Sequence, residues 1–404
     1  MLKNVRLICE RIFQVLSRAG VLLLIPVAAT PDEASLFFFI ITSVALASFL
    51  SSFQIFYYFN RKFGCTHSIF FLKLLRGVAV ALAIIFAPLF CFIILSVLFL
   101  GGYKQVSLLT LILFYFLVVL EVILIEKGRL LLNIESVSSY NWFDWGRVIS
   151  SMSSLLIAFN FFNVGLNLIF LLIILAYIPF CFRDLLLLIR SDLLRRHFSK
   201  PKYLFSVVNK SKFYYFGTST SYWKSWLDRF LPLQLFGADI MVVLSIMLVY
   251  GSSLVSVLGA TLGAKLSREV LLGGLIRKQF IYTQLKIVSI YIICAVCGFF
   301  IMYMYFKLSS AVEFESVVFI NLILISLSSL ATILSVSLQG AVIRMDIGKK
   351  VFNIDLVAFV IYSVLWIFIL DLPSFALLPL TVYSITQYCF KVNLLLRPHS
   401  VAKM

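Results

Sequence analysis

Three charged side chains lie close together in the segment SYWKSWLDRFLP, residues 221–232. They are Lys224, Asp228 and Arg229, in a chain that is 62% hydrophobic and only 13% charged. Lys224 and Asp228 are spaced i,i+4, so on a helix they can pair on one face. Arg229 then lacks an anion nearby in the sequence, and arginine does not lose its proton in proteins. A partly compensated cationic segment of this kind is suited to binding an anion.

Two more charged residues stand inside long apolar runs, Arg18 and Glu121. A charge at the centre of a membrane helix costs about 2.5–3.5 kcal/mol, so it usually faces a partner or a cavity. We predict that Arg18, Lys224 and Arg229 line a cationic cavity for substrate. The simpler interpretation is that these cations lie near the ends of their helices and extend to the membrane surface.

The two acidic residues have two interpretations each. Glu121 lies near the inner end of its apolar run, with Lys127 and Arg129 in reach beyond it. It is either paired there or carries a coupling ion. Asp228 either compensates Lys224 one helical turn away or carries the ion itself.

Aromatic residues flank the charged segment: Tyr222, Trp223 and Trp226. Tyr and Trp commonly mark the membrane interface. Flat rings also stack on sugar rings, so sugar stacking is the second interpretation of these three side chains.

The elements that must position these residues are membrane-spanning helices. The mean hydropathy is +1.08, and 41 of the 404 residues are Phe. Apolar runs of about 18–25 residues recur, each long enough to cross about 30 Å of hydrocarbon as a helix. We expect an all-α polytopic membrane protein of about twelve spans. The spans are predicted at 12–29, 34–59, 77–100, 106–126, 143–160, 164–182, 213–231, 239–262, 286–306, 316–339, 356–370 and 374–394.

The basic residues orient these spans. If the N-terminus is cytoplasmic, only Lys104 and Lys307 of the 34 Lys and Arg residues fall on the opposite side. This bias predicts an N-in, C-in topology. It also accounts for the net charge of +17 as a membrane-facing property, with anionic membrane lipid as the partner and no nucleic acid.

The longest cytoplasmic connection, residues 183–212, leaves six predicted spans on either side. We therefore predict two six-helix bundles related as a parallel repeat. Residues 1–200 would form the N-terminal bundle with the following linker, and residues 201–404 the C-terminal bundle.

Motifs for covalent chemistry are missing from the sequence. All three histidines, His67, His197 and His399, lie in predicted cytoplasmic loops. There is no Walker A loop, GxSxG, HExxH or cluster with metal-ligand spacing. We expect a protein that is not an enzyme and holds no cofactor or metal.

The segment 221–260, SYWKSWLDRFLPLQLFGADIMVVLSIMLVYGSSLVSVLGA, resembles the seventh and eighth spans of the O-antigen and polysaccharide flippases, the Wzx family. These belong to the multidrug/oligosaccharidyl-lipid/polysaccharide exporter superfamily. Asp228 and Arg229 match an Asp-Arg pair that ends one helix there. The Gly-x-Tyr-Ser usual after the turn is replaced by MVVLSIMLVYGSS.

The resemblance implies a flippase in the bacterial inner membrane. Its substrate would be an undecaprenyl-pyrophosphate-linked oligosaccharide, such as an O-antigen repeat unit, moved from the inner to the outer leaflet by an ion gradient. The polymerase and chain-length regulator of the same pathway would be partners in polysaccharide and lipopolysaccharide biosynthesis. The residues agree on one point, because a pyrophosphate is an anion that needs cations inside the membrane.

Two other functions stay open. A membrane-embedded polysaccharide polymerase or ligase has a similar length and hydropathy, but it needs a large polar outer loop. The longest outer stretch here is near KLSSAVEFES, residues 307–316. A drug or cation exporter of the same superfamily would need unpaired carboxylates in its spans.

Overall fold

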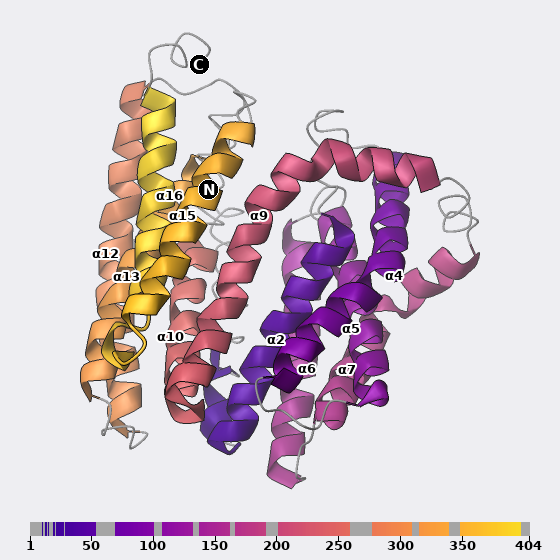
Figure 1. Ribbon diagram of the computed structural model, residues 1–404, viewed down its shortest axis with the longest axis horizontal. Helices are drawn as coiled ribbons and strands as arrows, with labels where there is room; N and C mark the ends of the chain where they lie inside the picture. Colours follow the sequence, from indigo (N-terminus) through magenta and orange to yellow (C-terminus); the bar gives the residue numbers. More distant parts are fainter. Residues whose placement is uncertain are drawn as a thin grey trace. The chain divides into compact units, whose positions relative to one another are not determined.

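The computed structural model describes residues 22–27, 29–53, 69–100, 107–131, 137–161, 166–190, 201–258, 277–308, 315–338 and 348–396, together with residues 10, 13, 15, 19 and 20. These residues form helices and a few turns and contain no strand (Figure 1). The helices are α2 (Pro31–Ser52), α4 (Ile69–Leu100), α5 (Leu108–Leu130), α6 (Val137–Phe161), α7 (Leu166–Arg190), α9 (Pro201–Phe236), α10 (Ala238–Leu254), α12 (Arg277–Leu308), α13 (Glu315–Ser337), α15 (Gly348–Phe368), the 3-10 helix η4 (Pro373–Phe375) and α16 (Leu378–Leu396).

The predicted all-α polytopic membrane fold is confirmed. Within the described residues, 8 helices are long and apolar enough to cross a membrane. The helices α6, α9 and α16 are not among them, although each overlaps a predicted span. All three carry charged side chains, such as Arg147 in α6, Asp228 in α9 and Lys391 in α16. The charged segment of residues 221–232 therefore lies on one of the less apolar helices, whereas Glu121 lies on the candidate span α5.

The sequence at the start of α2 explains where this helix begins. At α2, Thr30 accepts a hydrogen bond from the Glu33 backbone, and the Glu33 carboxylate accepts one from the Thr30 backbone at 3.0 Å. This capping box satisfies backbone donors that a helix end leaves unpaired, and Pro31 fits the first helical position. The residues TPDE, 30–33, therefore define the start of α2.

The chain forms two compact units, residues 1–226 and 227–404, which divide within α9. In the first unit, α5 packs against α2, α4, α6 and α7 (Figure 1). Its core consists of aliphatic side chains from α4 and α5, among them Val80, Leu82, Ile123 and Leu124, with Cys181 of α7. Most of α2 is buried within this unit. Its many Ser and Ala residues allow neighbouring helices to approach closely.

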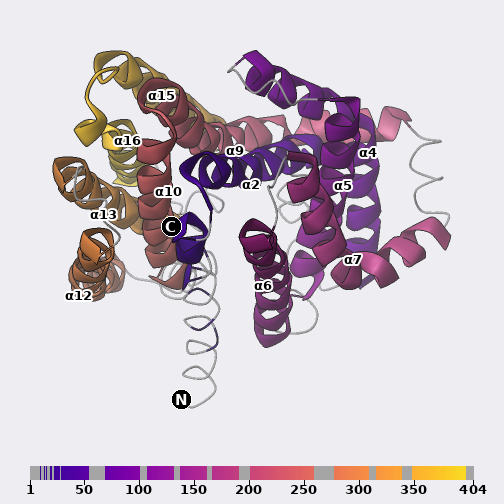
Figure 2. The same cartoon turned by 90° about the horizontal axis from the view of Figure 1, so that it is seen from below.

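In the second unit, α13 is the central helix. It packs against α10, α12 and α16, and α15 packs against α16 (Figure 2). Tyr291, Ile333 and Leu338 lie in the core between α12 and α13. The opposite side of α12 exposes large apolar residues such as Phe300 and Ile301, as expected of a helix that faces lipid tails.

Replacing Gly251 with alanine is expected to separate α10 from α13. A Cβ atom at Gly251 would lie 2.6 Å from Ile325 Cγ1 and 2.8 Å from Ser329 Oγ. Overpacking of this kind costs about 1–3 kcal/mol, so the melting temperature of the purified protein should fall. Gly20→Ala is the control, because its Cβ would meet no atom within 4 Å. Equal melting temperatures for the two variants would contradict the close packing of α10 and α13.

Candidate functional site

The charged segment lies well inside α9, a helix of 36 residues. The helix continues through Pro232 and ends only at Phe236. At 1.5 Å per residue, Arg229 is about 10 Å and Lys224 about 18 Å from this end. Both side chains are partly exposed, whereas Asp228 is 3% exposed. Of the predicted cavity cations, Arg18 lies outside the described residues.

Asp228 has a partner that the sequence did not reveal. Within the second unit, the Tyr362 hydroxyl of α15 donates a hydrogen bond to Asp228 Oδ1 at 2.8 Å. The Tyr362 ring is fully buried and packs against Phe359 and Tyr383, with ring centroids 5.9 and 6.1 Å away. The aromatic packing fixes the hydroxyl in place, so the acidic group is held by α15. Its pairing with Lys224 or its role with an ion stays a prediction.

A second polar group lies in the same unit, between α15 and α16. The Gln387 side-chain amide donates to Asp355 Oδ1 at 2.7 Å and to the Tyr383 hydroxyl at 2.8 Å. On the next turn of α16, Lys391 donates to Ser335 of α13 at 3.0 Å. Tyr383 also packs against Tyr362, which links this group to Asp228. Asp355 and Lys391 were not singled out in the sequence, because each stands at the edge of a span near a basic loop.

In the first unit, Glu121 is paired with Arg147 of α6. The Arg147 guanidinium donates to both carboxylate oxygens, at 2.7 and 2.8 Å. It also bonds Asp144 at 3.0 Å and lies over the Tyr177 ring, 5.7 Å from its centroid. Arg147 and Glu121 are largely buried, with side chains 14% and 13% exposed. In the structure, Glu121 is therefore a paired carboxylate. Its partner, Arg147, was not among the cations that the sequence suggested.

Lys127, one of the cations considered for Glu121, points elsewhere. Its ammonium lies 3.0 Å from Asp184 Oδ2, donates to the Phe180 carbonyl at 2.6 Å and sits over the Phe143 ring. These contacts tie α5 to α7 beyond Glu121. The side chain of Arg129 lies outside the described ones.

The three flanking aromatic residues belong to the first unit, where two of them pack against α2. Trp226 is 3% exposed, and its Nε1 donates to Ser43 Oγ at 2.9 Å. Tyr222 stacks on Phe49 with centroids 4.0 Å apart. Trp223 lies edge-on to Trp226 and is partly exposed. In this arrangement Trp226 and Tyr222 anchor α9 to α2, and their use in sugar stacking stays a prediction.

Comparison by sequence finds no relative of this chain, whereas comparison by structure does. No family model matches it, and no curated protein is similar to it in sequence. The structure resembles that of the eukaryotic MATE transporter AtDTX14, with a TM-score of 0.59 and 17% sequence identity over 100% of this chain and 98% of the other. MATE transporters belong to the same exporter superfamily as the polysaccharide flippases. The chain is a multi-pass membrane protein with the MATE transporter fold.

Proposed function

We propose that this protein is a flippase for lipid-linked oligosaccharides in the bacterial inner membrane. It would bind an undecaprenyl-pyrophosphate-linked glycan, such as an O-antigen repeat unit, at the inner leaflet and release it at the outer leaflet. No covalent bond changes in this process. The polymerase and chain-length regulator of the same pathway would receive the product.

The observation that carries the proposal is the depth of Lys224 and Arg229 in α9. A side chain extends only a few ångströms along its helix, and α9 continues for about 10 Å beyond Arg229. Lys224 lies about 18 Å from the same end, still further inside this helix. Cations at this depth need an anionic partner or water. A pyrophosphate linker that passes α9 would be attracted by these two cations, because their charge is opposite to its own.

The second candidate is an exporter of organic cations. The buried carboxylates of Asp228 and Asp355 favour it, because carboxylates attract cations. Each of them, however, already accepts a hydrogen bond from a neighbouring side chain, Tyr362 or Gln387. The Glu121 carboxylate of the first unit is bound by Arg147. We therefore favour the anionic substrate.

Reconstitution into proteoliposomes distinguishes the two candidates. A lipid-linked oligosaccharide with a fluorescent sugar is placed in both leaflets, and a membrane-impermeant quencher reports the fraction that has changed sides. We expect the protein to accelerate the exchange of this lipid and to leave the uptake of tetraphenylphosphonium, an organic cation, unchanged. Uptake of tetraphenylphosphonium without exchange of the glycolipid would replace the flippase by the cation exporter.

The α9 cations give a prediction in the same assay. We expect Lys224→Met and Arg229→Met each to lower the exchange rate by about tenfold or more, because each removes a charge that compensates the pyrophosphate. Lys224→Arg should retain most of the rate. Lys202→Met is the matched control, since Lys202 is an exposed cation near the start of the same helix. Equal rates for the control and both deep variants would remove the cationic pathway from the mechanism.

A further inference from the structure

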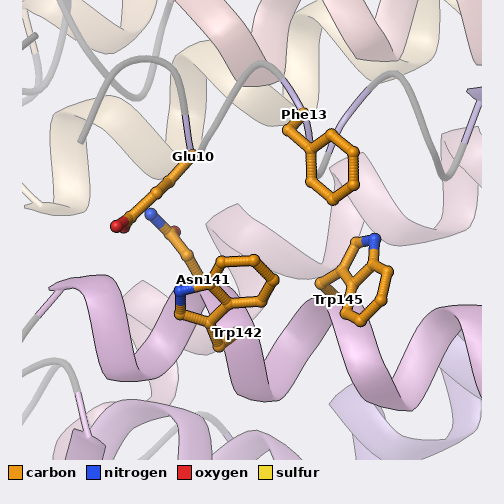
Figure 3. Close-up of a pocket in the computed structure, with 5 residues that line it drawn as sticks. All are labelled: Glu10, Phe13, Asn141, Trp142 and Trp145. Carbon is orange, nitrogen blue, oxygen red and sulfur yellow. The ribbon is translucent and has the colours of Figure 1, made fainter. Parts of the chain in front are cut away.

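A small hollow in the first unit lies between α6 and the chain that precedes α2. It is lined by Glu10, Phe13, Asn141, Trp142 and Trp145, and holds about 160 Å³ of space between atoms, part of it open to the outside (Figure 3). The hollow is too small to enclose an oligosaccharide. One ring can lie over its rim while polar groups reach in.

The rim of the hollow is aromatic. Trp142 and Trp145 meet edge to face with centroids 5.6 Å apart, and Phe13 lies 5.8 Å from Trp145 and 6.4 Å from Trp142. Phe13 is 51% exposed and Trp142 50% exposed. These rings present flat apolar faces to whatever occupies the hollow.

The floor of the hollow is polar and incompletely bonded. Asn141 is 3% exposed, and its amide nitrogen points toward the end of the hollow where Glu10 lies (Figure 3). Among the described residues, Asn141 Nδ2 and Trp145 Nε1 are buried without a hydrogen-bond acceptor. A buried donor left unbonded costs about 1–3 kcal/mol. These two groups can only donate, whereas the Glu10 carboxylate at the same hollow accepts, so a ligand that suits the lining offers both acceptors and donors.

This combination selects among the ligands that aromatic residues attract. An organic cation would suit the rings and the Glu10 carboxylate, but a quaternary ammonium accepts no hydrogen bond. A lipid tail likewise offers no acceptor. Tryptophans that anchor a protein at the membrane interface keep the N–H in the polar layer, whereas Trp145 has a buried one. A sugar ring has both an apolar C–H face and hydroxyl oxygens.

We propose that this hollow is a subsite for one sugar ring of the transported glycan; the inference rests on the proposed flippase function. The ring stacks on Trp142 and Phe13, and one of its oxygens accepts from Asn141 Nδ2. The site is held in place from the other side of α6, because Arg147 clamps this helix to Glu121 of α5. Helix α6 thus both anchors the unit and carries the sugar contacts.

The test is direct binding to the purified full-length protein by titration calorimetry. The probe is the water-soluble oligosaccharide released by mild acid from the lipid-linked donor of the source cells. We expect Trp142→Ala and Asn141→Leu to weaken its binding by about tenfold or more, through lost stacking and a lost hydrogen bond. Trp142→Phe keeps a flat ring and should bind within about threefold of the unmodified protein. Phe116→Ala is the matched control, since Phe116 is 53% exposed on α5, away from the hollow.

The outcomes separate this inference from the proposed function. The subsite is overturned if Trp142→Ala and Asn141→Leu bind the oligosaccharide as tightly as the unmodified protein does. It is also overturned if the unmodified protein binds no oligosaccharide. Neither result affects the flippase proposal, which the exchange assay in proteoliposomes tests separately. If Trp142→Ala loses tetraphenylphosphonium binding but still binds the oligosaccharide normally, the hollow is a cation site instead. The flippase proposal is overturned if the unmodified protein does not exchange the glycolipid. In that case, oligosaccharide binding that is weaker in Trp142→Ala than in the unmodified protein would still support a glycan site in the hollow. Melting temperatures of all variants exclude loss through unfolding.

Discussion

Replacing Arg147 with methionine is expected to destabilise the first unit by about 3–5 kcal/mol, the usual cost of removing one partner from a buried ion pair. The guanidinium binds both oxygens of Glu121 and one of Asp144, and all three side chains are largely buried. Without Arg147, two carboxylates would face each other in a medium that solvates them poorly. The melting temperature of the purified protein, and its level in the membrane, should both fall.

A double-mutant cycle tests whether the Arg147 effect comes from the pair itself. The double variant Arg147→Met with Glu121→Gln should lower the melting temperature less than Arg147→Met alone does, because one uncompensated charge disappears. Arg147→Lys should recover only part of the stability, since one ammonium lacks the two separate nitrogens that bind Glu121 and Asp144. Arg183→Met is the control, because Arg183 is an exposed cation on α7. A melting temperature for Arg147→Met equal to that of the control would show that the pair contributes nothing.

The second large effect is expected at Asp228, where Asp228→Asn should abolish glycolipid exchange and lower the protein level. The carboxylate is buried and held by the Tyr362 hydroxyl at 2.8 Å. An asparagine can still accept this hydrogen bond, so the loss would come from the missing charge. Lys224, one turn earlier on α9, would then be a cation with less compensation. Tyr362→Phe keeps the charge and should cost only about 1.5–3 kcal/mol, the usual value of a hydrogen bond to a charged group.

Adding Lys224→Met to Asp228→Asn distinguishes pairing from ion coupling at Asp228. If the two residues form a pair, the second substitution should restore the protein level. We expect this restoration, because the i,i+4 spacing on a continuous helix suits a pair. A double variant with a normal protein level but no exchange would instead assign ion coupling to Asp228. A double variant that is no more abundant than Asp228→Asn would refute the pair.

The class of fold was predictable from the sequence because crossing a membrane depends on local properties. About twenty apolar residues in a row are sufficient to span the hydrocarbon, and helices are the form that satisfies their backbone groups. The cap at Thr30 and the first helical residue Pro31 depend on equally local features of the sequence. The charged segment of α9 was also evident, because three charges stand out in an apolar run. Its continuation to Phe236 was not, since Pro232 resembles a helix end.

The partners of the charged residues could not be predicted in the same way. The sequence offered Lys127 and Arg129 for Glu121, because they are the nearest cations along the chain. The structure instead pairs Glu121 with Arg147, 26 residues away, and directs Lys127 to Asp184 of α7. Which of several cations reaches a carboxylate depends on how α5, α6 and α7 are rotated and placed, and hydropathy does not record this.

The same physical reason separates what the sequence determined from what only tertiary structure decided. A soluble helix shows its buried face through an apolar stripe, whereas a membrane helix is apolar on nearly every side. The sequence therefore determined that the chain is an all-α membrane protein and that α9 carries charge. Packing decided that Trp226 bonds Ser43, 183 residues earlier, and that Asp228 meets Tyr362, 134 residues later. Those contacts exist because close helix packing selects one face of each helix, and side-chain partners follow from that choice.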